Sequence, residues 1–184
     1  MAIRRSPPSN KMVIFTNYSI TNKKKMRSRT ANWFECKIRY DKTMEDGMQK
    51  KVTESYTVDA LSFTEAEQRI MEEMSSYISG EFEVNDIKKA SYKEIFFDDS
   101  DMADRWYKAK LQFITIDEKT EKEKRSNVNY LVQAGTLNGA VKNIDEVMGG
   151  TMIDYVIVSV AETSLMDVFE YKKKEQDDKP EFEQ

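Results

Sequence analysis

The sequence of 184 residues has no histidine, one cysteine and only three prolines. Without histidine there can be no Ser-His-Asp or Cys-His triad and no imidazole metal ligand, and the commonest general base near neutral pH is missing. The lone Cys36 cannot form an internal disulfide, and a zinc site needs about four ligands, typically Cys and His. We therefore expect a protein that is not an enzyme and has no cofactor.

Long hydrophobic runs are also missing. No stretch approaches the roughly 18 to 20 apolar residues of a membrane-spanning helix, and polar residues interrupt the segment 12–18, which therefore does not resemble a secretory signal. A cytoplasmic protein without a membrane partner is the default expectation. The net charge of −4 argues against wrapping DNA in a generally basic surface, although it leaves room for a local basic patch.

Both ends of the chain are charged and lack a sustained apolar periodicity. Residues 1–29 predict a disordered basic extension, and translation starting at Met26 is an alternative to Met1. Residues 172–184 predict a disordered, solvated charged tail.

Between these ends the sequence repeats itself. The segment 33–40, which begins with Trp33, aligns with 106–113, which begins with Trp106, 73 positions later. The segment 56–60 and the apolar positions 66, 70 and 74 recur at an offset of 74. This order and spacing predict two copies of one unit, over 30–97 and 105–171, joined by an acidic linker over 98–104.

Each copy predicts a β-β-α-β unit. The segment 33–40 alternates, with Phe34, Cys36 and Ile38 on the inward face, as in a half-buried strand. Ser62 and Glu65 form a capping box at the start of a helix. In the second copy Thr136 is the N-cap, and the segment 155–160 is nearly continuous in apolar residues, as in a central strand with both faces covered.

A three-stranded unit with one helix is marginal on its own, because its edges and one face need cover. We therefore expect the two copies to unite in one α+β domain of about six strands and two helices. Both helices should lie on one side, and an approximate internal two-fold axis should relate the two units.

Two chemistry candidates have simpler explanations. The linker 98–104 is rich in aspartate but lacks the glycine and the terminal glutamate of a Ca²⁺-binding EF-hand loop, so a solvated connection is favoured. The alternation turns Cys36 inward, and Ala109 takes its place in the second copy, which favours a small core thiol over a nucleophile.

The outward face of the first strand in each copy is the most informative candidate site. It combines a tryptophan with basic residues at alternate positions, as in sheets that stack bases and bind phosphates. The alternative is that the tryptophans pack under a loop or against another subunit while the cations only keep the protein soluble. The candidate nucleic-acid-binding residues are Trp33, Lys37 and Arg39 in the first copy and Trp106, Lys108 and Lys110 in the second.

Three segments, 32–43, 58–67 and 139–143, resemble an uncharacterised domain-of-unknown-function family common in Bacteroidota genomes and their phages. The resemblance covers roughly residues 26–172. It implies a bacterial or phage origin and supports a start near Met26, but it implies no activity and no catalytic residues.

The sequence thus favours a non-enzymatic binding module for single-stranded nucleic acid or nucleic-acid machinery. One alternative is a protein–protein adaptor or dimerisation domain that acts as a homo-oligomer. The other is a binder of a nucleotide-like small molecule in a cleft between the copies.

Overall fold

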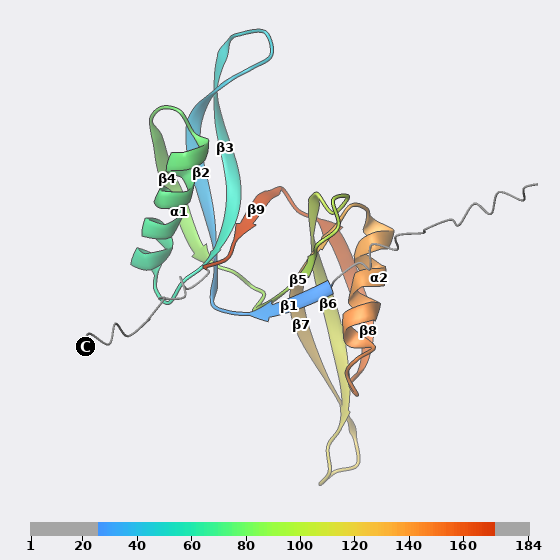
Figure 1. Cartoon of the computed structure of the whole chain (residues 1–184). Coiled ribbons are helices and arrows are strands. Elements are labelled where there is room, and N and C mark those ends of the chain that lie inside the picture. Colours follow the sequence, from blue (N-terminus) through green and yellow to red (C-terminus); the bar gives the residue numbers. More distant parts are fainter. Residues whose placement is uncertain (1–25, 172–184) are drawn as a thin grey trace, which may run out of the picture.

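Residues 26–171 are described in the computed structural model of the chain, where they form two helices and nine strands in two sheets (Figure 1). The predicted α+β class is confirmed, but the predicted strand number of about six was too low. The elements in chain order are β1 (Met26–Thr30), β2 (Trp33–Thr43), β3 (Gln49–Asp59), α1 (Phe63–Tyr77), β4 (Phe82–Lys89), β5 (Glu94–Asp98), β6 (Arg105–Ile116), β7 (Glu123–Ala134), α2 (Leu137–Met148), β8 (Asp154–Glu162) and β9 (Leu165–Phe169).

Sheet A has the strand order β1-β5-β7-β6-β8, and sheet B has the order β4-β2-β3-β9. A long antiparallel hairpin lies in each sheet, β6–β7 in sheet A and β2–β3 in sheet B, and the two hairpins point in opposite directions (Figure 1). The short strand at the end of each half crosses to the other sheet: β5 pairs in parallel with β7, and β9 pairs in parallel with β3. This exchange makes the two halves interdependent.

Each helix covers its own sheet. In sheet B the core cluster joins Ala66, Ile70 and Met74 of α1 to inward residues of the hairpin such as Cys36 and Ile38. An equivalent cluster joins α2 to sheet A. The helices lie on opposite sides of the molecule (Figure 1), so the prediction that both lie on one side was wrong. The reason is that the chain builds two sheets, each of which has one face to be covered.

The predicted helix starts are confirmed. The Ser62 hydroxyl accepts a hydrogen bond from the Glu65 amide (3.2 Å), and the Thr136 hydroxyl accepts one from the Gly139 amide (3.0 Å). The Glu65 carboxylate accepts from the amide of Leu61, one residue before the N-cap, rather than from the N-cap itself. Both caps satisfy amides that the first helical turn leaves without a partner.

The two predicted terminal segments fall partly or wholly outside the described residues. The predicted extension over 1–29 lies outside them for residues 1–25, while Met26–Thr30 forms β1 against β5, so its predicted end was too late. Five residues with two arginines carry too weak a pattern to be recognised as a strand without the partner strand. The predicted tail over 172–184 lies outside the described residues.

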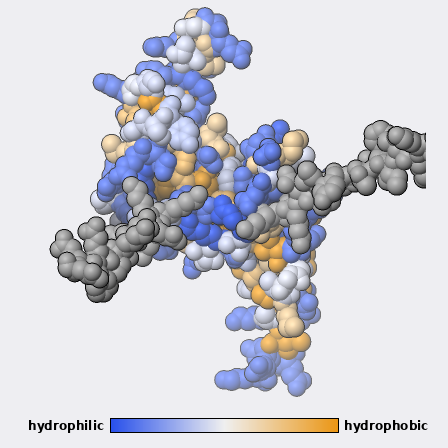
Figure 2. Space-filling view, viewed as in Figure 1, coloured by the Kyte–Doolittle hydropathy of each residue, from blue (hydrophilic) through white to orange (hydrophobic). Residues whose placement is uncertain are grey.

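β8 departs most from its predicted position. Its apolar sequence predicted a central strand covered on both faces, but β8 lies at the edge of sheet A, where Val156 and Val158 are 48% and 50% exposed. The side of the molecule seen in Figure 2 is mostly hydrophilic, with smaller hydrophobic areas between the polar ones. Among residues 26–171, no helix combines the length and apolarity needed to cross a membrane.

Candidate functional site

The two tryptophans of the predicted site are buried. Trp33 is 1% exposed and Trp106 is 3% exposed, so the predicted stacking platform is wrong for both. The Trp33 indole donates to the carbonyl of Lys93 (3.2 Å), and Trp106 meets Phe97 edge-on with ring centroids 5.8 Å apart. The alternation placed the tryptophans on the correct face. However, it could not reveal that residues of both sheets pack together over that face.

These tryptophans belong to one core cluster that is shared by the two sheets. Its members come from both halves of the chain: Trp33, Tyr92, Ile95, Phe97, Trp106, Leu131 and Val168. β5 and β9, the strands that cross between the sheets, supply Ile95, Phe97 and Val168. The cluster therefore joins the sheets, and the tryptophans have a structural role.

The basic residues predicted for sheet B are paired with acids. Lys37 lies 3.8 Å from the Asp86 carboxylate, and Arg39 hydrogen-bonds to Glu83. Both acids are on β4, directly opposite their partners across the β2–β4 ladder. A third pair joins Lys88 of β4 to Glu35 of β2 at 2.8 Å. This face is balanced in charge by its own cross-strand pairs.

The basic residues predicted for sheet A are not paired in this way. Lys108 and Lys110 are half-buried on β6, and neither forms an ion pair with an acid within residues 26–171. Opposite them on β8 lie Ala161 and Ser159, which carry no charge. The Lys108 ammonium is 5.9 Å from the centre of the Tyr92 ring. Sheet A therefore presents two cations that have no counter-charge on the facing strand.

Amide side chains surround these two lysines. Across the β6–β7 ladder Lys110 faces Asn129 and Gln112 faces Asn127, and the Gln112 amide donates to the Asn127 carbonyl oxygen (3.3 Å). We call Lys108, Lys110, Gln112, Asn127 and Asn129 the sheet A face. An open depression of about 390 Å³ adjoins it at Asn127 and Asn129. A sheet surface with cations and amide donors is suited to an extended anionic ligand.

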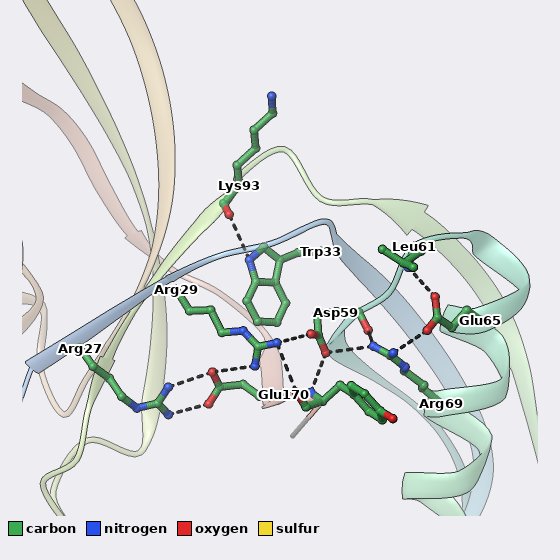
Figure 3. A network of polar contacts seen from close by, with 10 residues as sticks. Arg27, Arg29, Trp33, Asp59, Leu61, Glu65, Arg69, Lys93 and Glu170 are labelled. Carbon is green, nitrogen blue, oxygen red and sulfur yellow. Dashed lines mark hydrogen bonds and ion pairs between the residues drawn. The ribbon is translucent and has the colours of Figure 1, made fainter. Parts of the chain in front are cut away.

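A second polar cluster joins the sheets beside the shared core (Figure 3). Arg27 of β1 binds both oxygens of Glu170 at 2.8 and 2.6 Å. Arg29 bridges Glu170 (3.3 Å) and Asp59 (2.5 Å), and Arg69 of α1 contacts Asp59 at 3.3 Å. We call these five residues the ionic clamp, because they join β1 of sheet A to the end of β3, to the residue after β9 and to α1, which packs on sheet B.

Electrostatics indicate that the clamp is structural. Burial acts to raise the pKa of Glu170, but hydrogen bonds from Arg27 and Arg29 outweigh it and hold that pKa below its ordinary value. Asp59 also accepts from the backbone amide of Tyr171 (2.7 Å). An open depression of about 630 Å³ borders the clamp at Arg29, Asp59 and Arg69, but each of these charges already has an opposite charge beside it.

The sequence interpretation missed the clamp because Arg27 and Arg29 were assigned to the extension. Their alternate spacing was the available signal, since residues two apart on a strand share a face. Glu170 gave no signal, because its partners are 143 and 141 positions away in the chain.

A counterpart of this junction, with amide side chains in place of the arginines, lies in the second half. The Asn143 amide of α2 donates to the Asp98 carboxylate (2.9 Å) and to the carbonyl of Gln133 (2.8 Å). The Gln133 side chain accepts from the Asp98 amide (3.2 Å) and donates to the carbonyl of Ala103 (2.9 Å). Asp98 is thus a buried end of the predicted acidic linker, which is otherwise mostly exposed, as Asp99, Asp101 and Asp104 are.

The remaining candidates for reactive or metal-binding chemistry are Cys36 and the acidic side chains. Cys36 is fully buried, and burial raises its thiol pKa to about 12, followed in effect by the nearby Asp86 and Glu35 carboxylates. A thiol with this pKa is neutral at pH 7 and packs as a small apolar side chain. Within residues 26–171, no group of three or more Cys, Asp and Glu side chains is arranged to hold a metal ion.

The chain belongs to the family described as domain of unknown function DUF4494, whose model matches residues 32–171. The match begins just before β2 and ends directly after β9 and the clamp residue Glu170. The comparison with curated proteins found no match, and neither did the comparison with solved structures.

Proposed function

We propose that this protein is a non-enzymatic binding module built from two diverged copies of one unit, and that its sheet A face binds the phosphate backbone of single-stranded nucleic acid. The observation that carries the proposal is the pair of half-buried lysines, Lys108 and Lys110, which have no acidic partner on the facing strand. Bases would lie against the amide side chains and the depression beside them.

The pairing registers support the duplication. β2 and β4 pair with a bulge after Lys37, and β6 and β8 pair with a bulge after Lys110, 73 positions later. The crossing strands agree too, since Val58 faces Phe169 and Val132 faces Phe96. These are equivalent positions in the two copies, because Val132 follows Val58 by 74 residues and Phe169 follows Phe96 by 73. The unit that recurs is therefore β-β-α-β-β, with a last short strand that the sequence pattern did not separate.

The divergence between the copies favours sheet A over sheet B as the binding face. The counterpart of Lys110 is Lys37, and Asp86 already neutralises it. A phosphate approaching sheet B would have to displace carboxylates, whereas one approaching Lys108 and Lys110 would displace only water and counter-ions. The proposal thus keeps half of the predicted site, its lysines in the second copy, and discards the stacking tryptophans.

The binding test uses fluorescence anisotropy of a labelled oligo(dT) of about 30 nucleotides, long enough to span a single-strand site. We expect Lys108→Ala/Lys110→Ala to weaken binding at least about tenfold at low salt. The slope of log affinity against log salt should fall by about 1.4, because each phosphate contact on a single strand contributes about 0.7.

The matched control is Lys37→Ala/Arg39→Ala, which removes the same amount of positive charge from the equivalent strand of sheet B. It should leave binding nearly unchanged. Equal losses in both double variants would indicate a net-charge effect without a specific face. If the wild-type protein binds neither DNA nor RNA single strands at low salt, the nucleic-acid proposal is wrong.

The other two functions predict different partners. A protein adaptor is favoured by one observation, the uncharged edge strand β8. A nucleotide-like small molecule would use one of the open depressions between the elements, and its binding would raise the melting temperature with concentration. A bacterial or phage origin and a cytoplasmic location belong to the proposal as well; gene neighbourhood and cell fractionation would test them.

A further inference from the structure

The two outer strands that follow the helices, β4 in sheet B and β8 in sheet A, are edges of opposite chemistry. β4 carries charged residues along its length, among them Glu83, Asp86, Lys88 and Lys89. Such charges prevent an edge from pairing with another strand. From residue 155 to residue 161, β8 carries no charge at all and contains four valine and isoleucine residues. This edge lacks the usual protection.

Its exposure adds to the contrast. Val156 and Val158 point away from α2 and are about half exposed, and the preceding Ile153 is 42% exposed. Along one edge β8 pairs with β6, and this is its only strand partner within residues 26–171. The backbone groups along its outer edge have no strand partner within residues 26–171. An unpaired edge strand that is rich in β-branched residues and carries no charge is a template for the addition of another strand.

We propose that β8 pairs antiparallel with β8 of a second copy, so that two sheets A join into one continuous sheet across a two-fold axis. This inference is independent of nucleic-acid binding. The self-pairing is favoured by the regular part of the strand, where exposed and half-buried residues alternate from Asp154 to Val158 before the bulge. A two-fold centred on Val156 places like faces together, with Val156 opposite its own copy and Tyr155 opposite Ile157.

Charge also fits a second copy. In this register Asp154 of each protomer lies opposite Val158 of the other, and Val158 lies at the bulge, next to Ser159, which pairs with Lys110 of β6. Asp154 of one protomer and Lys110 of the other then lie on one face, two strand spacings or about 10 Å apart, and no like charges lie opposite each other. At that distance the attraction is modest, and the lysine remains available to a ligand. A register centred on Val158 would instead set Asp154 against Glu162, two acids.

The first test is light scattering coupled to size exclusion on the full chain at several concentrations. We expect a species of twice the chain mass of 21.5 kDa at the higher concentrations. Val156→Lys should shift it to a monomer, because it places two lysines opposite each other at the axis. The matched control is Asn85→Lys, an exposed residue of β4 at the position equivalent to Val158, and it should leave the dimer intact.

A second variant covers the case in which Val156→Lys fails to fold. Residues directly opposite in an antiparallel pair have Cα atoms about 4.5 to 5.5 Å apart, within reach of a disulfide. Val156→Cys should therefore form a covalent dimer with diamide, whereas Ser159→Cys should form much less. The buried Cys36 does not compete. A wild-type chain that stays monomeric at all concentrations would overturn the proposal. So would a dimer that Val156→Lys leaves intact and that Val156→Cys does not cross-link.

Discussion

Sheet A and sheet B correspond in the order of four strands, β8-β6-β7-β5 and β4-β2-β3-β9, but differ in the chemistry of three cross-strand pairs. In sheet B the pairs are ionic: Glu35 with Lys88, Lys37 with Asp86, and Arg39 with Glu83. At the equivalent positions of sheet A stand Lys108 with Ala161, Lys110 with Ser159, and Gln112 with Val156. The comparison shows that the net charge of a sheet face depends on its cross-strand pairs. Lys37 is neutralised by Asp86, whereas Lys110 faces the uncharged Ser159 and keeps its charge available.

The junctions where the second strand of each hairpin ends differ in the same way. Asp59 and Arg69 are joined by ionic contacts in sheet B, whereas Gln133 and Asn143 hold the equivalent places in sheet A with neutral groups. The backbone bonds correspond: Asp59 accepts from the Tyr171 amide as Gln133 accepts from the Asp98 amide. The same connection is therefore made once with ion pairs and once with amide side chains.

The largest effect is expected where the two halves do not differ, at the shared core. Trp33→Ala and Trp106→Ala should each lower the free energy of unfolding by about 3 to 5 kcal/mol, because each removes a large buried ring. Urea denaturation measures this loss. Leu61→Ala, which changes a residue that is 86% exposed, serves as the control and should cost less than about 0.5 kcal/mol. Small losses for the tryptophans would contradict their role between the sheets.

The two junctions can be compared directly. Asp59→Ala removes the acceptor for Arg29, Arg69 and the Tyr171 amide, and should cost about 2 kcal/mol, as expected for hydrogen bonds to charged groups. Gln133→Ala removes neutral bonds and should cost about 1 kcal/mol. High salt should reduce the first loss and leave the second unchanged, because only the ionic contacts are screened. The same salt response in both variants would show that the junctions do not differ electrostatically.

The sequence was most informative where the signal was local. The hydroxyls of Ser62 and Thr136 cap the helices as expected, and the alternation placed Cys36 on the inward face, because these features depend on neighbours within a few residues. Periodicity reveals which face a residue occupies, but not what covers that face. For this reason Trp33 was assigned to the correct side of the strand and to the wrong environment.

The missed elements share a different cause. β1, β5 and β9 have five residues each, and they are strands because a partner distant in the sequence lies beside them: β5 and β9 pair with the other half, and β1 pairs with β5. Such pairing over a long sequence distance leaves no period in the sequence. In β8 the local pattern was misleading instead. Its run of apolar residues predicted burial on both faces, but within residues 26–171 only one face of β8 is covered. The prediction for β8 and the self-pairing proposal thus rest on the same residues.

The smallest expected effect concerns the pH dependence of the ionic clamp. Glu170 has a pKa below its ordinary value of 4.5 in the folded protein because Arg27 and Arg29 outweigh the effect of burial. A carboxyl with a lowered folded pKa stabilises the protein above its unfolded pKa, and this contribution is lost as the pH falls through the folded pKa. Glu170→Gln should therefore be less stable than the wild type at pH 7, and the gap should narrow towards pH 3. Urea denaturation at both pH values measures the gap, and urea is suitable because it adds no ionic screening. Gln133→Ala supplies the control, because the side chain of Gln133 bonds only backbone groups, which do not titrate, and its loss should depend much less on pH. A gap that stays constant would mean that Glu170 acts by its shape and hydrogen bonds rather than by its charge.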